Sequence, residues 1–209
     1  MPIDAVVFDI GRVLIDWQPE KFYDRAIGPD RRRALFDAVD LYRMNDGVDL
    51  GADFAESVEA LAAAHPDWAA EIRLWRSHWI EMAQPEIPGS VRVLRALKAR
   101  GVPVYALTNF GAETFQTACA AYPFLDLFDR RFVSAHLRVM KPAPGIYEIL
   151  EAETGHPPER LIFTDDKAEN VDAAAARGWH THLFTGPEGW AARLREAGLL
   201  TEKEGAPHG

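Results

Sequence analysis

Residues 5–14 read Ala5-Val6-Val7-Phe8-Asp9-Ile10-Gly11-Arg12-Val13-Leu14. This apolar run, bounded by an acid and a glycine, predicts a buried parallel β-strand whose C-terminal end delivers Asp9 into a crevice. A carboxylate directly after a strand can instead have a purely structural role and cap the next turn. The role of Asp9 therefore depends on what the rest of the chain brings near it.

The second half of the chain alternates between short apolar strands and amphipathic helices. We expect strands at residues 103–107, 131–133, 161–164 and 180–184, and helices at residues 90–100, 112–122, 144–154, 168–177 and 190–197. Strands separated by helices imply a parallel sheet, and ligands of such folds bind outside the carboxyl ends of the strands. The predicted fold class is α/β, with a doubly wound, Rossmann-like parallel sheet as its core.

A helical stretch interrupts this alternation after the first strand. We expect helices at residues 19–26, after a cap at Asp30, around residues 54–61, and from Asp67 to Met82. The division is a core at residues 1–16 and 84–200, a small all-α cap at residues 17–83 and a flexible tail at residues 201–209. Residues 84–89 are expected to be the return linker. Residues 41–47 are expected to be an exposed polar loop. The alternative is that this loop lies over a neighbouring site and contacts the substrate.

Composition and charge exclude several classes of partner. The formal net charge of -9 opposes binding to nucleic acid and to anionic membranes. Cys119 is the only cysteine, so an intrachain disulfide is impossible and a reducing compartment is the simpler assumption. The N-terminus lacks a signal-peptide pattern, and no apolar run approaches the roughly 18 residues of a membrane span. A cytoplasmic protein is expected.

Polar residues follow several of the predicted strands. Asp9, Thr108-Asn109, Lys141 and Asp165-Asp166 converge at one edge if the sheet is parallel. Carboxylates gathered around one crevice repel each other unless a positive charge lies among them, and Mg²⁺ with Lys141 can supply it. Thr108 and Asn109 can donate hydrogen bonds to phosphoryl oxygens. The combination predicts magnesium-assisted chemistry on a phosphate.

These four motifs, in this order, resemble those of the haloacid dehalogenase superfamily, as does the helical insertion after the first. The resemblance implies that Asp9 attacks phosphorus, forms an aspartyl-phosphate and binds Mg²⁺. It implies further metal ligands in the Gly11 carbonyl and Asp166, with Asp165 acting directly or through water. Thr108 and Lys141 would hold the phosphoryl oxygens, and Lys141 would keep Asp9 ionised and oriented.

Gly11 departs from the common pattern of the superfamily's phosphatases, which have a second aspartate there as general acid and base. That help is typically worth about 10²–10⁴-fold, and Asp16 or Tyr42 is a possible replacement donor. A subgroup that includes the α-D-glucose-1-phosphate phosphatases is similar to this chain in having glycine at that position. A sugar 1-phosphate has a more acidic leaving oxygen than an ordinary alkyl ester, so a sugar phosphate is one hypothesis for the substrate.

The resulting functional prediction is a Mg²⁺-dependent phosphatase acting on a small phosphorylated metabolite, as a monomer or homodimer. A metal-independent 2-haloacid dehalogenase is the alternative, because such enzymes also lack the second aspartate. A non-catalytic binding or regulatory protein on the same fold is the second alternative. The Asp165-Asp166 pair favours the phosphatase, since a metal-free site has no use for clustered carboxylates around Asp9.

Overall fold

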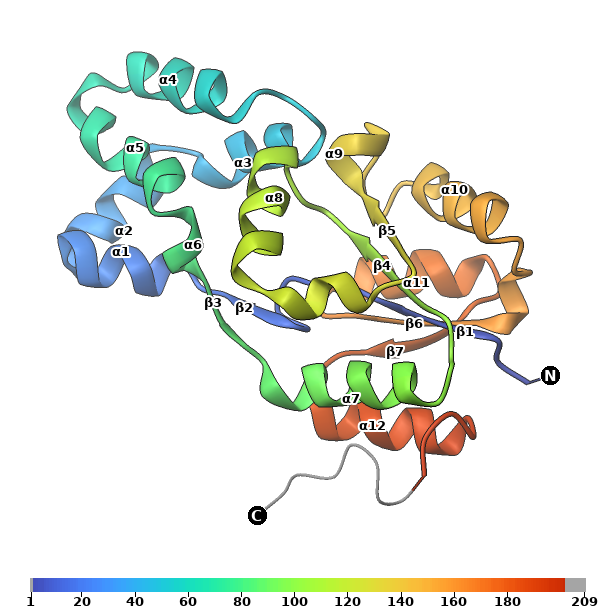
Figure 1. Ribbon diagram of the computed structural model, residues 1–209. Helices are drawn as coiled ribbons and strands as arrows, with labels where there is room; N and C mark the ends of the chain where they lie inside the picture. Colours follow the sequence, from blue (N-terminus) through green and yellow to red (C-terminus); the bar gives the residue numbers. More distant parts are fainter. Residues whose placement is uncertain (1, 202–209) are drawn as a thin grey trace.

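The computed structural model describes residues 2–201 and places a five-stranded parallel sheet at the centre of the core (Figure 1). The strand order is β5-β4-β1-β6-β7. The strands are β1 (Ala5–Phe8), β4 (Val104–Thr108), β5 (Arg130–Val133), β6 (Leu161–Asp165) and β7 (His180–Leu183). The doubly wound parallel sheet predicted from the alternation of strands and helices is therefore confirmed.

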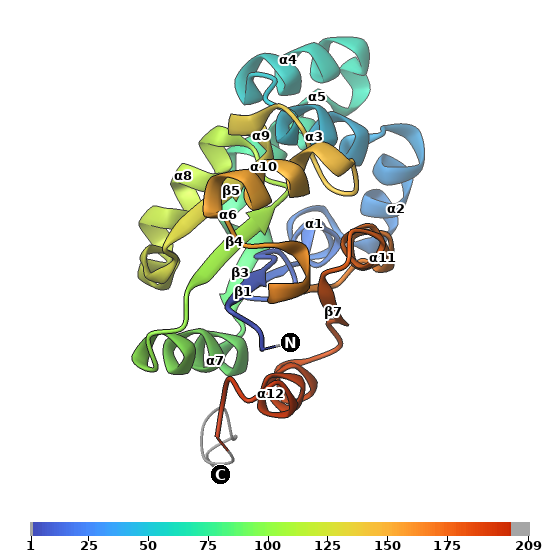
Figure 2. The ribbon, with the colours of Figure 1, turned by 90° about the vertical axis from the view of Figure 1, so that its right-hand side faces the viewer.

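Helices cover both faces of this sheet, as Figure 2 shows. One face carries α7 (Pro88–Ala99), α8 (Ala112–Ala121) and α12 (Pro187–Glu196), and the other carries α10 (Pro144–Thr154) and α11 (Ala168–Ala176). Alternate residues of β1 point to opposite faces, so Val6 and Phe8 pack into one apolar cluster and Ala5 and Val7 into the other. Burial on both faces explains why β1 has no polar residue.

The strand order reverses its direction of winding between β1 and β6, which is where open α/β sheets bind ligands. Phe8 pairs with Thr164 in the register of these two strands. The next residue on each strand, Asp9 and Asp165, therefore emerges at the same edge. The backbone N–H of Asp9 also donates to the carbonyl of Thr164 at 3.0 Å.

The predicted helical insertion is present above the carboxyl edge of the sheet (Figure 1). It contains α1 (Pro19–Ile27), α2 (Pro29–Ala38), α3 (Leu41–Asp49), α4 (Phe54–Ala64), α5 (Ala69–Ser77) and α6 (Trp79–Met82). The antiparallel ribbon of β2 (Ile15–Trp17) and β3 (Ala83–Glu86) lies across both predicted boundaries, and its strand β3 covers part of the expected linker. The division into core and cap at those boundaries stays a prediction.

Local expectations for the cap were wrong in three places. Residues 41–47 belong to helix α3 rather than to a loop, because the Asp40 carboxylate caps its first turn by accepting from the Arg43 N–H at 2.9 Å. Helix α2 begins after Gly28, not Asp30, since Pro29 occupies its first position.

The third error concerns the helix expected from Asp67 to Met82, which is divided at His78. The preceding Ser77 hydroxyl donates to the Arg73 carbonyl at 3.1 Å, a contact that commonly bends helices.

Two further observations bear on the predicted surroundings. Of the tail expected at residues 201–209, all but Thr201 lies outside the described residues. Among the helices that the structure describes, none has both the length and the apolar character needed to cross a bilayer.

Candidate active site

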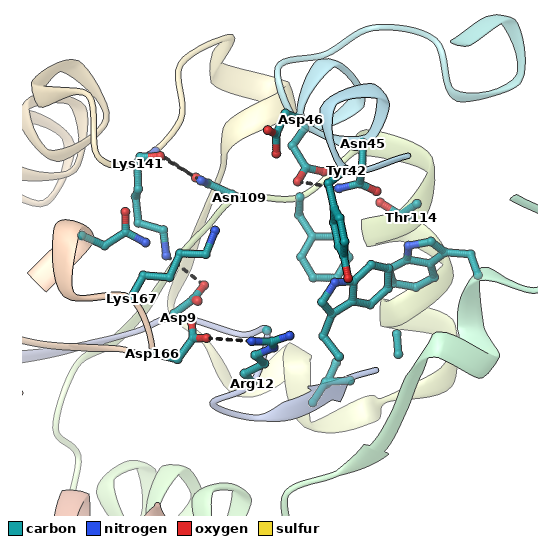
Figure 3. Close-up of a pocket in the computed structure, with 18 residues that line it drawn as sticks. Asp9, Arg12, Tyr42, Asn45, Asp46, Asn109, Thr114, Lys141, Asp166 and Lys167 are labelled. Carbon is teal, nitrogen blue, oxygen red and sulfur yellow. Dashed lines mark hydrogen bonds and ion pairs between the residues drawn. The ribbon is translucent and has the colours of Figure 1, made fainter. Parts of the chain in front are cut away.

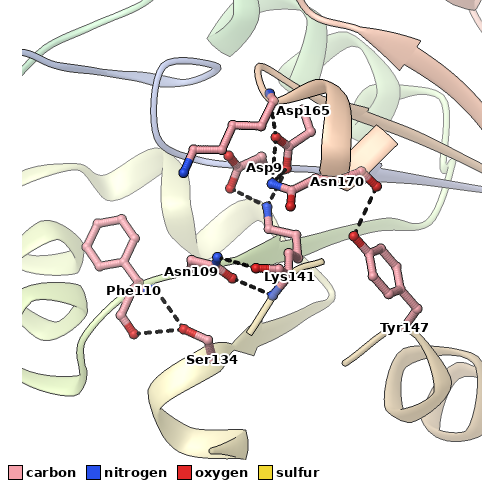
Figure 4. Close-up of polar contacts among 9 residues, drawn as sticks. Asp9, Asn109, Phe110, Ser134, Lys141, Tyr147, Asp165 and Asn170 are labelled. Atoms are coloured by element: carbon pink, nitrogen blue, oxygen red, sulfur yellow. Dashed lines mark hydrogen bonds and ion pairs between the residues drawn. The ribbon is translucent and has the colours of Figure 1, made fainter. Parts of the chain in front are cut away.

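A buried cluster of one lysine and two carboxylates lies at the carboxyl edge of β1 and β6 (Figure 4). Lys141 Nζ is 2.9 Å from Asp9 Oδ1 and 2.6 Å from Asp165 Oδ2. The side chain of Lys141 is only 1% exposed, although it carries a charge. Burial opposes that charge, but the carboxylates of Asp165 and Asp9 outweigh it and raise the pKa of the ammonium. Lys141 is therefore a cation held at the base of the site.

Asp165 and Asp166 are adjacent in sequence but have different surroundings. The Asp165 carboxylate is fully buried and accepts from Lys141, from the Asn170 amide at 2.9 Å and from the Lys167 N–H at 2.8 Å. The Asp166 side chain is 18% exposed and lines the cavity, with Arg12 Nη1 4.0 Å away. Asp165 thus holds Lys141 in place, whereas Asp166 remains open to a ligand.

Asp9, Asp165 and Asp166 bring one oxygen each within 4.8 Å of one another. Burial raises the pKa of both Asp9 and Asp166, while the ammonium of Lys141 lowers the pKa of Asp9. The three carboxylates of this cluster carry more charge than the single buried ammonium of Lys141 can neutralise. Hard carboxylate oxygens in this arrangement are the donor set that Mg²⁺ prefers, so the residues present fit such an ion.

The end of β4 contributes Thr108, and the loop that follows contributes Asn109. Both polar atoms of the Asn109 side chain bond to the backbone of Lys141, with Nδ2 donating to its carbonyl at 2.9 Å and Oδ1 accepting from its N–H at 2.8 Å. The Thr108 hydroxyl is buried and has no hydrogen-bond partner among the described residues. An unpaired buried hydroxyl costs free energy unless a bound group accepts its hydrogen bond.

A cavity of about 230 Å³ opens above Asp9 between the core and the cap (Figure 3). Its floor includes Asp9, Gly11, Asn109, Lys141 and Asp166. Helix α3 contributes the opposite wall with Tyr42, Asn45, Asp46 and Asp49. The rings of Trp17, Trp79 and Phe110 form a third side of the cavity. The ring centroids of Trp17 and Trp79 are 5.8 Å apart, and those of Trp79 and Phe110 are 5.4 Å apart.

Sequence reasoning missed several residues of this cavity. The four α3 residues are spaced i, i+3, i+4 and i+7, which is one face of a helix, and that spacing was the available signal. Trp79 is both buried and part of the wall, and its helical spacing in the sequence indicates only packing. No sequence pattern indicates that Arg12 and Lys167 line the cavity. Arg12 is directed there by its left-handed backbone (φ 56°), and Lys167 by its place at the edge of the sheet.

The chain matches the family model of haloacid dehalogenase-like hydrolases over residues 3–178. That range includes all four predicted motifs and the whole cap. The protein therefore belongs to this family of hydrolases.

Similar proteins include two phosphatases. A sesquiterpene phosphatase of Aspergillus oryzae is 41% identical over 86 residues, which is 41% of this chain and 44% of that protein. The chain thus spans less than half of that relative. The D-ribitol-5-phosphate phosphatase of Bacteroides thetaiotaomicron is 21% identical over 204 residues, covering 92% of this chain and 97% of that protein.

Solved structures share the fold. A family enzyme of Bacteroides thetaiotaomicron, crystallised with magnesium and inorganic phosphate, superposes with a TM-score of 0.71 at 21% identity. The superposition covers 92% of this chain and 100% of that chain.

Proposed function

We propose that this protein is a Mg²⁺-dependent phosphatase that hydrolyses a small phosphate monoester through an aspartyl-phosphate on Asp9. The observation that carries the proposal is the buried Lys141–Asp9 pair beside an open Asp166 at the floor of a cavity. An isolated nucleophilic carboxylate would gain little from a buried lysine and a third carboxylate. A site for a dianionic phosphate and a divalent cation needs both.

Mg²⁺ would be held by Asp9, Asp166 and the carbonyl of Gly11, and when bound it neutralises charge on the phosphoryl oxygens. Asp165 contributes by orienting Lys141, since its oxygens already accept bonds from Lys141, Asn170 and Lys167. This division of labour refines the expectation that Asp165 acts on the metal directly or through water.

Thr108, at the end of β4, and Lys141 support the phosphoryl group in this proposal. Thr108 donates its unpaired hydroxyl to a phosphoryl oxygen, and Lys141 binds another as a point charge. Asn109 acts by holding the backbone of Lys141; its predicted direct bond to substrate stays a prediction.

The cavity favours a substrate that has a flat apolar face, such as that of a ring, and also carries hydroxyl groups. The rings of Trp17, Trp79 and Phe110 offer flat surfaces for stacking, and the α3 side chains offer hydrogen-bonding groups. A sugar phosphate meets both requirements, as the absence of an acid at Gly11 also suggests. Higher catalytic efficiency on simple alkyl phosphates than on sugar 1-phosphates would remove this substrate hypothesis.

A metal-independent 2-haloacid dehalogenase remains the competing activity on this fold. The clustered carboxylates disfavour it, because displacement of halide by Asp9 needs no cation. The two reactions differ in a direct assay: a chelator abolishes the phosphatase, whereas a dehalogenase releases halide from 2-chloropropionate in its presence.

The deciding experiment is a screen of phosphate monoesters with and without Mg²⁺, on wild type and Asp9→Asn. We expect Mg²⁺-dependent phosphate release by wild type and a loss of about 10³-fold or more in the variant, which lacks the nucleophile. Equal hydrolysis by the two proteins would refute the mechanism. A wild type that hydrolyses no ester at any Mg²⁺ concentration would favour the non-catalytic alternative.

A further inference from the structure

The position of the usual second aspartate is open space in this protein. A Cβ added to Gly11 would meet no other heavy atom within 4 Å, so packing does not explain the glycine. An ester with a poor leaving group nevertheless needs a proton at the departing oxygen. Any acid that supplies it has to come from another wall of the cavity.

The two replacement donors considered from the sequence are poorly placed. Asp16 does not line the cavity. Tyr42 does, but its hydroxyl donates to the carboxylate of Glu20. Burial and the neighbouring Glu20 also raise the pKa of Tyr42, which makes it a weaker acid. Helix α3 carries a better candidate at its C-terminal end.

Asp49 lines the cavity from the cap side, and a chain of side-chain contacts orients its carboxyl group. Asn45 Nδ2 donates to Asp49 Oδ2 at 3.0 Å, a contact drawn as a dashed line from Asn45 in Figure 3. The Asn45 amide is itself oriented, because Trp75 Nε1 donates to its Oδ1 at 3.1 Å. The carboxyl of Asp49 therefore has a defined direction rather than free rotation.

The backbone of Asp49 is tied to the core as well. Ser134, which is buried after β5, donates its hydroxyl to the Asp49 carbonyl at 2.6 Å and accepts from the Phe110 N–H at 2.9 Å. Close approach requires glycine on both sides of this contact. A Cβ on Gly111 would lie 2.6 Å from Val48 Cγ1, and one on Gly51 would lie 2.8 Å from a core carbonyl. Asp49 thus keeps its place relative to the nucleophile's strand.

We propose that Asp49 is the general acid and base of this enzyme, supplying from the cap the proton that Gly11 does not. The inference rests on the proposed phosphatase function. In the first step an oxygen of Asp9 bonds to phosphorus as the bond from phosphorus to the ester oxygen breaks. That oxygen keeps the electron pair and takes the proton of Asp49, so the alcohol leaves. In the second step Asp49 takes a proton from water as the water oxygen bonds to phosphorus, and the bond to Asp9 breaks to release phosphate.

The electrostatic surroundings of Asp49 suit this role. Burial raises its pKa to about 7, and the carboxylates of Asp46 and Asp9 act in the same direction. Lys167 and the backbone N–H of Gly111 oppose them. Near neutral pH the group can therefore exist in both protonation states, as a residue that first donates and then accepts a proton must.

The test compares two esters on wild type and Asp49→Asn at pH 6. Butyl phosphate has a poor leaving group, whereas 4-nitrophenyl phosphate leaves without a proton. We expect kcat/KM on butyl phosphate to fall about 10²-fold or more in the variant, and kcat/KM on 4-nitrophenyl phosphate to change by less than about threefold. This parameter reports formation of the aspartyl-phosphate, whereas kcat also includes its hydrolysis, which is the same for both esters. Retained activity on the second ester shows that the variant is folded. Asp30→Asn, a change of the same kind at an exposed carboxylate of the cap helix α2, should leave the ratio of the two rates near that of wild type.

The pH profile provides a second readout. Wild-type kcat/KM on butyl phosphate should fall as the pH rises through about 7, because Asp49 then loses its proton. This fall should be absent in Asp49→Asn and should move to lower pH in Asp46→Asn. An unchanged ratio of rates in Asp49→Asn would overturn the role of Asp49 while the phosphatase function stands. A wild type inactive on both esters at every Mg²⁺ concentration would overturn both proposals.

Discussion

At the scale of a single residue, the unpaired hydroxyl of Thr108 bears most directly on the proposed function. This hydroxyl is buried without a partner among the described residues, whereas Lys141, Asp9 and Asp165 are all paired. A buried hydroxyl in that condition costs about 1–3 kcal/mol in the free protein. The cost is recovered only if a bound group accepts its hydrogen bond.

Replacing Thr108 with valine should therefore separate stability from activity. The shape is nearly the same, so we expect the free energy of unfolding to stay equal or rise by about 1 kcal/mol. We expect kcat/KM on phosphate esters to fall about 10- to 100-fold, because one bond to the phosphoryl group is lost. Urea denaturation and steady-state kinetics measure the two quantities. A destabilised variant with full activity would show that the hydroxyl is structural.

Helix α3 is the element of the cap that both lines the cavity and packs against the core. Its inner face supplies four cavity residues, and its last turn packs against the loop after β4. The contact between Val48 and Gly111 has no room for a methyl group. The position of the whole helix over Asp9 therefore depends on a glycine that lies in a different part of the sequence.

Gly111→Ala should shift α3 away from the core. A Cβ at 2.6 Å from Val48 Cγ1 and 2.9 Å from Thr114 Oγ1 has to displace one of them, and overpacking typically costs about 1–3 kcal/mol. We expect that loss in denaturant unfolding, with a lower kcat on alkyl phosphates. Gly47→Ala is the matched control on α3, since its Cβ meets nothing within 4 Å. The control should gain up to about 1 kcal/mol from helix propensity. Equal effects of the two substitutions would argue against a close α3–core contact.

At the scale of the whole molecule, the core carries an excess of negative charge at one edge of its sheet. Asp9, Asp165 and Asp166 meet there against one buried lysine. The free protein tolerates this repulsion because hydrophobic burial on both faces of the sheet supplies the stability. A bound cation should relieve it and so stabilise the entire fold.

Adding Mg²⁺ should raise the thermal unfolding midpoint of the wild type. Saturation at 100 times the Kd corresponds to about 2.7 kcal/mol, because the ion binds only the folded state. Asp166→Asn should lose most of this effect, whereas Asp30→Asn, a carboxylate 94% exposed on α2, should keep it. A midpoint that is independent of Mg²⁺ would contradict a metal site at these carboxylates.

The sequence by itself determined the layers of the core and the order of the groups around Asp9. The local pattern of apolar and polar residues indicates which faces of the strands and helices are buried. Parallel strands place their carboxyl ends at one edge of the sheet, independent of the loop conformations. Only the tertiary structure decided the different burial of Asp165 and Asp166, the bonds of Asn109 to the backbone of Lys141, and the position of Asp49 in the cavity wall. Each depends on contacts between distant segments, such as the bond between Ser134 and Asp49, 85 residues apart. No local pattern of apolar and polar residues encodes which side chain meets which across such a separation, so the group that can replace the acid missing at Gly11 became visible only in the folded chain.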